Sequence, residues 1–142
     1  MTEADRERAQ ELVRTGKFGA LSTLGKGGHP FGSLVAYATT APILLISDLA
    51  EHTQNLRADP RAALLVVATG PEPLAQGRVT LMGRCTPAVR AEVEADYLAA
   101  HPSASAYLAL GDFGFWRLAV ESVRYVGGFG KMGWIDGAVW SG

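Results

Sequence analysis

The sequence predicts a mainly β protein of the α+β class, built around an antiparallel sheet or barrel. Short apolar segments with turn residues between them follow one another in hairpin succession. The chain contains 17 glycines, which concentrate near the ends of these segments, where tight turns need them. Strands do not alternate regularly with helices, so the pattern does not fit a Rossmann fold.

The first segment is expected to form a helix that begins at Thr2 and ends near Gly16. Thr2 can cap this helix, and Asp5 stands at the matching position of a capping box. Two strands are then expected at 18–24 and 31–40. They flank the glycine-rich turn GKGGHP, which is typical of a β-hairpin.

The next segment, PILLIS, is predicted to be a third, buried strand at 42–47. It leads into a short helix that the Asp59-Pro60 pair ends, because proline disfavours a helical residue before it. The remaining expected elements are a strand at 61–69, a loop at 71–76, a strand at 77–88, helices at 88–102 and 103–111, and one or two strands at 113–135.

Composition limits the classes of protein. The 142 residues fit one domain, 1–142, and 48% hydrophobic residues can build a core. Thirteen basic and 14 acidic side chains without a basic block make nucleic acid a poor partner. The single cysteine, Cys85, excludes an internal disulfide and fits a reducing cytoplasm. The chain starts without an apolar signal segment and its apolar stretches are short, so we expect a soluble cytoplasmic protein with no membrane partner.

Familiar catalytic motifs are missing: the sequence contains no GxGxxG, P-loop, HExxH or GxSxG pattern in the required context. His29, His52 and His101 are far apart, so a zinc site would depend on folding. Ser33, His52 and Asp48 contain the residue types of a catalytic triad, but their local context does not favour one. No metal site is predicted and no catalytic residue is named.

Three stretches have both a structural and a functional interpretation. In HPFGSLVAY, Gly32 and Ser33 allow close approach of a ligand, or form a glycine bulge. In SDLAEHTQNLRADP, the free N–H groups of a helix start can bind an anion, or Ser47 or Asp48 simply caps the helix. In GGFGKMGWI, glycines beside aromatic residues and a lysine can cover a planar ligand, or close a barrel end or a subunit interface.

Taken together and in order, KFGALSTLGKGGHPFGSLVAYATT, LISDLAEHTQNLRADPRAALLVV, GRVTLMGRC and VRYVGGFGKMGWI resemble the FMN-binding split-barrel proteins of the pyridoxamine 5′-phosphate oxidase-like superfamily. Within it, the pattern EHTxNLxxDP and a terminal GGFG resemble the haem-utilisation branch. The resemblance implies a six-stranded antiparallel split β-barrel, Greek-key-like, with flanking helices. It also implies a homodimer with FMN at the subunit interface.

The resemblance also assigns cofactor-binding residues. One segment would contact the flavin ring, with Ser33 where the oxidases have an arginine, and a second would hold the phosphate, with His52-Thr53 replacing an Arg-Lys pair. A cation on a later strand would lie near the flavin, and the C-terminal hairpin would supply a loose match to the oxidases' Trp and Arg. These residues are Gly32, Ser33, Leu34, Val35, Ser47, His52, Thr53, Arg78, Lys131 and Trp134.

The function implied is an FMN-dependent oxidoreductase that uses a nicotinamide electron donor or a small-molecule substrate. The arginine pattern of true pyridoxamine phosphate oxidases is missing, which argues against vitamin B6 synthesis. Because histidine is only partly charged at neutral pH, FMN affinity is expected to fall as pH rises through the pKa of His52. The alternatives are haem binding or degradation, disfavoured by the lack of a histidine after His101, and a non-enzymatic carrier of flavin or deazaflavin.

Overall fold

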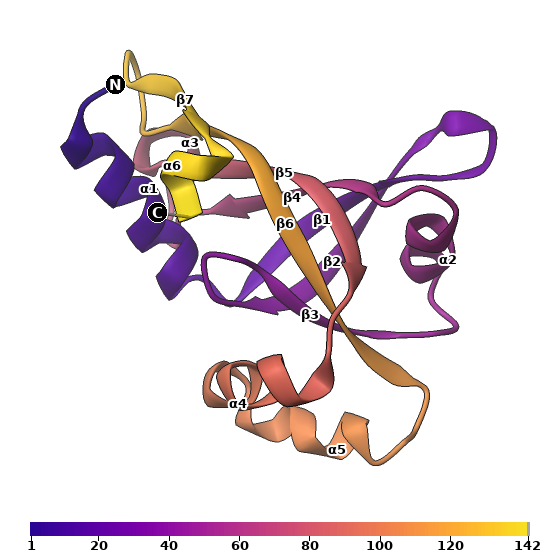
Figure 1. Ribbon diagram of the computed structural model, residues 1–142. Helices are drawn as coiled ribbons and strands as arrows, with labels where there is room; N and C mark the ends of the chain where they lie inside the picture. Colours follow the sequence, from indigo (N-terminus) through magenta and orange to yellow (C-terminus); the bar gives the residue numbers. More distant parts are fainter. Residues whose placement is uncertain (142) are drawn as a thin grey trace.

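The computed structural model describes residues 1–141 and has an α+β fold, a closed six-stranded antiparallel β-barrel with a seventh strand outside it (Figure 1). The strands are β1 (Phe18–Leu24), β2 (Pro30–Ala38), β3 (Ile43–Ser47), β4 (Arg61–Val67), β5 (Arg78–Pro87), β6 (Phe113–Val126) and β7 (Met132–Asp136). The hairpin between β1 and β2 projects from the barrel and turns through a short 3₁₀ helix, η1 (Lys26–Gly28).

The strand order explains how the barrel closes. The sheet runs β3-β2-β1-β4-β5-β6-β7, and β3 also pairs with β6. Strand β4 returns beside β1 after the β1–β2–β3 succession, which is the Greek-key arrangement. The predicted six-stranded split barrel is therefore confirmed. Strands β2 and β3 pair only at Tyr37–Leu44 and Ala38–Ile43, so the first half of β2 has no strand partner on that side.

The main core fills the barrel. Alternating side chains of the strands point inward, and Leu21, Leu64 and Leu81 are fully buried. Helix α1 (Glu3–Thr15) covers one end of the barrel, and its predicted capping box between Thr2 and Asp5 is present. Cys85 is buried in this core, and burial raises the pKa of its thiol to about 12.

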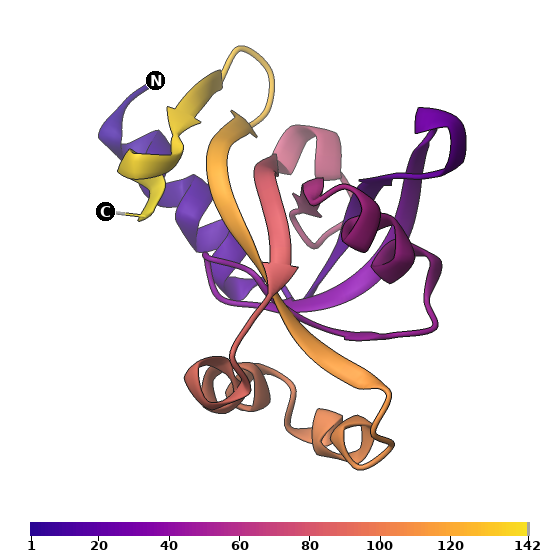
Figure 2. The same cartoon turned by 45° about the vertical axis from the view of Figure 1, so that its right-hand side comes forward.

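A smaller core lies beneath the helices of the later half of the chain. Helix α4 (Arg90–Ala100), the 3₁₀ helix η2 (Pro102–Ala104) and helix α5 (Ser105–Leu108) form a group at one side of the barrel (Figure 2). They pack on β3 and β6, where Tyr97 contacts Phe115 edge to face. The His101 Nε2–H group donates to the Tyr37 carbonyl at 2.7 Å, which fixes the end of α4 to β2.

Several boundaries differ from those predicted. The loop expected at 71–76 contains a short helix, α3 (Pro73–Gln76), because Pro73 is well placed in a first helical turn. Strand β2 ends at Ala38, since Thr39 adopts a φ of 69° and turns the chain. The C-terminal strands are followed by an unexpected helix, α6 (Gly137–Ser141), which packs beside α1 through a Gln10 side-chain bond to the Trp140 carbonyl. No described helix has the length and apolar character needed to span a membrane.

Candidate functional site

The start of helix α2 (Glu51–Ala58) does not have the side-chain cap that Ser47 or Asp48 could have provided. Its N-cap residue is Ala50, and no side chain caps the first turn. The Ser47 hydroxyl instead accepts from the Leu49 N–H at 3.1 Å, and the Thr53 hydroxyl donates to the Ser47 carbonyl at 2.6 Å. Capping by Ser47 or Asp48 is therefore wrong. Both hydroxyls hold the turn that precedes the helix, and the helix start lacks a capping group.

A pair of side chains joins α2 to β2. Ser33 Oγ lies 2.9 Å from His52 Nδ1 in a hydrogen bond between residues 19 positions apart. The other ring nitrogen, His52 Nε2, is buried without a hydrogen-bond partner in residues 1–141. Asp48 does not complete a triad, because its carboxylate pairs with Arg57 at 2.9 Å. The structure thus brings together two of the three residues that could have formed a triad.

The pKa of His52 is lowered from its ordinary value because burial disfavours the charged imidazolium. This shift favours the neutral form of the ring that Ser33 contacts. The expected pH dependence of FMN affinity stays a prediction, and its window moves to lower pH unless bound phosphate raises the pKa again.

We expect His52 to weaken the fold in acid. The pKa of His52 is lower in the folded protein than its unfolded value of 6.5. The neutral ring therefore contributes its full share of folding stability above pH 6.5, and this share is lost as the pH falls through the folded-state pKa. Urea unfolding at about pH 7.5 and about pH 5 should show a smaller acid loss in His52→Asn than in the natural protein. The matched control is His29→Asn at an exposed histidine. Equal acid losses in the natural protein and His52→Asn would contradict this assignment.

The residues assigned to the flavin ring lie on β2, but they do not share one environment. Leu34 is 77% exposed on the outer face, next to exposed Gly32, whereas Val35 is buried in the core. Ser33 points toward α2, as its bond to His52 requires. The β2 and α2 residues therefore form one group around the Ser33–His52 pair. Whether this group binds a cofactor stays a prediction.

The other assigned residues form a second group on β5 and the β6–β7 hairpin. Arg78 donates to the Leu74 carbonyl at 3.2 Å, and Lys131 lies in the exposed turn before β7. Trp134 is 62% exposed, and the Arg124 guanidinium lies 5.2 Å from its ring centroid. Strands β1 and β4 separate β2 from β5 in the sheet. One chain therefore does not bring the two groups together.

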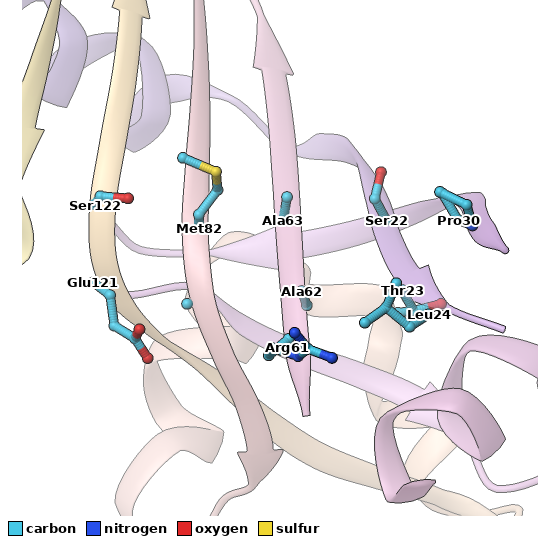
Figure 3. A pocket seen from close by; sticks show the side chains of 11 residues that line it. Ser22, Thr23, Leu24, Pro30, Arg61, Ala62, Ala63, Met82, Glu121 and Ser122 are labelled. Atoms are coloured by element: carbon cyan, nitrogen blue, oxygen red, sulfur yellow. The ribbon is translucent and has the colours of Figure 1, made fainter. Parts of the chain in front are cut away.

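A feature that the sequence did not predict is a cavity of about 370 Å³ on the outer face of the sheet. It lies across β1, β4, β5 and β6 (Figure 3), where Ser22 pairs with Ala63, Ala63 with Met82, and Met82 with Ser122. The small side chains of Ser22, Ala63 and Ser122 leave the hollow, and Met82 lies between the last two. The remaining lining residues are Thr23, Leu24, Pro30, Arg61, Ala62, Gly83 and Glu121.

Exposed apolar side chains lie along one side of this cavity. Leu34 lies opposite Ala20, Ala20 opposite Leu65, and a row continues through Thr80 and Arg124 to Trp134. Phe18, Val67 and Met132 are exposed as well, to between 48% and 60%. A protein surface with so many neighbouring apolar groups commonly serves as an interaction face. Among the described residues, no group of three His, Cys, Asp or Glu side chains is placed to bind a metal ion.

Comparison with known proteins identifies the family. The family model for pyridoxamine 5′-phosphate oxidase matches residues 6–127. A chloroplastic protein of Arabidopsis thaliana named non-canonical haem oxygenase HOZ is 42% identical over 118 residues, which cover 78% of this chain and 36% of that protein.

Solved structures show the same fold. A haem-binding protein from Mycobacterium smegmatis superposes with a TM-score of 0.92 at 36% identity, over 99% of this chain and 61% of that one. The haem storage protein HutZ from Vibrio cholerae, at 19% identity, has a TM-score of 0.63 over 92% of each chain. The chain therefore spans about a third of the plant relative and three fifths of the mycobacterial one. By its family match and its split barrel, this protein belongs to the pyridoxamine 5′-phosphate oxidase-like family, as its motifs predict.

Proposed function

We propose that this protein binds haem on the outer face of its barrel and takes part in haem use or breakdown. The observation that carries this proposal is the cavity across β1, β4, β5 and β6, whose small side chains leave room for a flat ring. The names of the plant and mycobacterial relatives support it. This chain spans only part of each of these relatives.

The residues around the cavity suit the chemistry of haem. Its wall is mainly apolar, with Ala62, Ala63 and Met82, and matches an apolar ring system. At its rim, Arg61 has donors suited to a propionate, although it also pairs with Asp59 at 2.7 Å. Met82 and the exposed His29, next to Pro30, belong to the residue types that bind haem iron. Bound haem would supply the redox-active iron, and the chain would orient it and limit its contact with water.

The same face leads to a proposed homodimer with the cofactor between the subunits. The exposed row from Leu34 to Trp134 needs a cover, and a second copy of the same face supplies one of matching apolar character. A partner also allows the β2–α2 group of one chain to meet the β5–β7 group of the other. Light scattering after gel filtration should give twice the 15.0 kDa chain mass.

The second candidate is an FMN-dependent oxidoreductase that uses a nicotinamide electron donor or small-molecule substrate. It is favoured by the uncapped start of α2, because free N–H groups at a helix start bind phosphate. Ser47, His52 and Thr53 lie at that start, beside Gly32 and Ser33 on β2. A cytoplasmic location and one cofactor-binding domain over 1–142 remain parts of this proposal.

Titration of the purified ligand-free protein distinguishes the candidates. Added haem should give a saturable Soret band that differs from that of free haem, and added FMN should keep its free fluorescence. Quenched FMN fluorescence without a haem complex would replace the first candidate by the second. A protein that binds neither compound would overturn both candidates. If the protein binds both compounds, competition titrations between FMN and haem show whether they share one site.

A further inference from the structure

A second cavity, of about 340 Å³, lies between α2, the start of α4, α5 and the first part of β6. It shares no lining residue with the cavity on the outer face. Arg57 enters it from α2, Arg90 from α4, and Phe113 and Trp116 from β6. Four separate elements thus converge on a space large enough for a small organic molecule.

Trp116 gives this cavity an unused hydrogen-bond donor. The side chain is only 4% exposed, and its indole Nε1–H has no acceptor in residues 1–141, whereas the Trp140 indole donates to the Thr40 carbonyl at 2.8 Å. Buried indole N–H groups usually have a partner. The only fully enclosed side-chain polar atom without a partner in the described chain is His52 Nε2. The Trp116 N–H is therefore not sealed, and it keeps an open side.

Gly114 indicates where that open side lies. It also lines the cavity, and a β-carbon built on it would meet a single neighbouring atom, Trp116 Nε1, at 4.0 Å. Apart from the neighbouring residues Phe113 and Phe115, no other protein atom lies within 4 Å of that position, so the side of Trp116 that faces Gly114 is open. A ligand atom that accepts a hydrogen bond can occupy this open side without displacing a side chain.

Two arginines at the cavity have hydrogen-bond donors left for an anion. Asp48, Arg57 and Arg90 line the cavity, and the first two pair with each other at 2.9 Å. Arg90 pairs with Glu94 through two of its five N–H donors, so both guanidinium groups keep donors for a further acceptor. Helix α4 also begins here at Arg90 without a capping side chain, and a helix start favours negative charge. The rest of the wall is apolar, with Leu108, Phe113 and Phe115.

We infer that this cavity binds a small carboxylate with an apolar body. The carboxylate accepts from the Trp116 indole N–H and the free arginine donors, and the apolar body packs on Phe113 and Leu108. This site is separate from the outer-face cavity proposed for haem, because the two cavities have no residue in common.

Nuclear magnetic resonance of ¹⁵N-labelled protein tests the inference with benzoate as the probe. The indole signal of Trp116, assigned with Trp116→Phe, should move saturably as benzoate is added, while the signals of Trp134 and Trp140 stay in place. Benzamide, which has the ring without the charge, and inorganic phosphate, which has the charge without the ring, should each bind roughly tenfold or more weakly. A Trp116 signal that benzoate leaves unmoved, or that phosphate moves equally, would overturn the inference.

Two variants connect the signal to the cavity. Gly114→Val fills the open space on a strand that tolerates valine, and should abolish the benzoate response. Arg57→Gln should weaken benzoate roughly tenfold, whereas the matched control Arg84→Gln, at an exposed arginine outside the cavity, should bind it normally. Unchanged Trp140 signals confirm that each variant is folded. Normal benzoate binding by folded Gly114→Val would exclude the cavity as the site.

Discussion

Substitution of Ala63 by phenylalanine is expected to weaken haem binding by about tenfold or more, equivalent to about 1.4 kcal/mol. Ala63 lies on β4 in the middle of the outer cavity, in register with Ser22 on one side and Met82 on the other. A phenyl ring there occupies the hollow beside Ser22 and Met82. Because Ala63 is only partly buried and points away from the core, the barrel itself should tolerate the change.

The matched control is Val67→Phe, which places the same ring on the same strand and the same face, but outside the cavity lining. Haem affinity is measured from the Soret band, and the mass of each variant is measured by light scattering. Haem affinity should fall in Ala63→Phe and stay near the natural value in Val67→Phe at equal dimer content. If Ala63→Phe bound haem as tightly as the natural protein, haem would have to bind elsewhere.

Local sequence patterns were sufficient for most of the fold. Alternating apolar residues located the strands, and the spacing of Thr2 and Asp5 located a real capping box, because both signals act within a few neighbouring residues. The helix start at α2 was harder to predict. Ser47 has a hydroxyl that fits either a cap or a turn. The Leu49 N–H donates to that hydroxyl and Thr53 donates to the Ser47 carbonyl, and these two bonds determine the outcome.

The candidate site depends on contacts that no single segment encodes. The outer cavity exists because Ser22, Ala63, Met82 and Ser122 fall into one row, and the register between four strands determines that row. Each of these residues is unremarkable in its own strand. The Ser33–His52 pair similarly joins β2 to α2 across a turn and a strand. Motif resemblance marked both residues but did not indicate that they would bond to each other.

Replacement of Gly83 by alanine is expected to destabilise the fold by about 3 kcal/mol, at the upper end of overpacking costs. Gly83 lies where the pairing of β5 and β6 shifts register, so that Met82 pairs with Ser122 but Gly83 with Val120. A β-carbon at this position would overlap the carbonyl oxygen of Ala119. The backbone of β6 cannot rotate away as a flexible side chain would, so strands must separate at the bulge.

Urea unfolding measures this cost, and Gly32→Ala is the matched control because a β-carbon on Gly32 meets no atom within 4 Å. A loss of about 3 kcal/mol is a large part of the 5–15 kcal/mol that stabilises a typical domain. Gly83 also lines the outer cavity, so the shift of β6 that relieves the overlap changes the cavity as well. Haem binding should therefore weaken in Gly83→Ala even at low temperature, where the variant is folded. Equal unfolding midpoints for the two alanine variants would mean that β5 and β6 can move apart at the bulge at little cost. The close approach of Gly83 to the Ala119 carbonyl would then not fix the shape of the outer face.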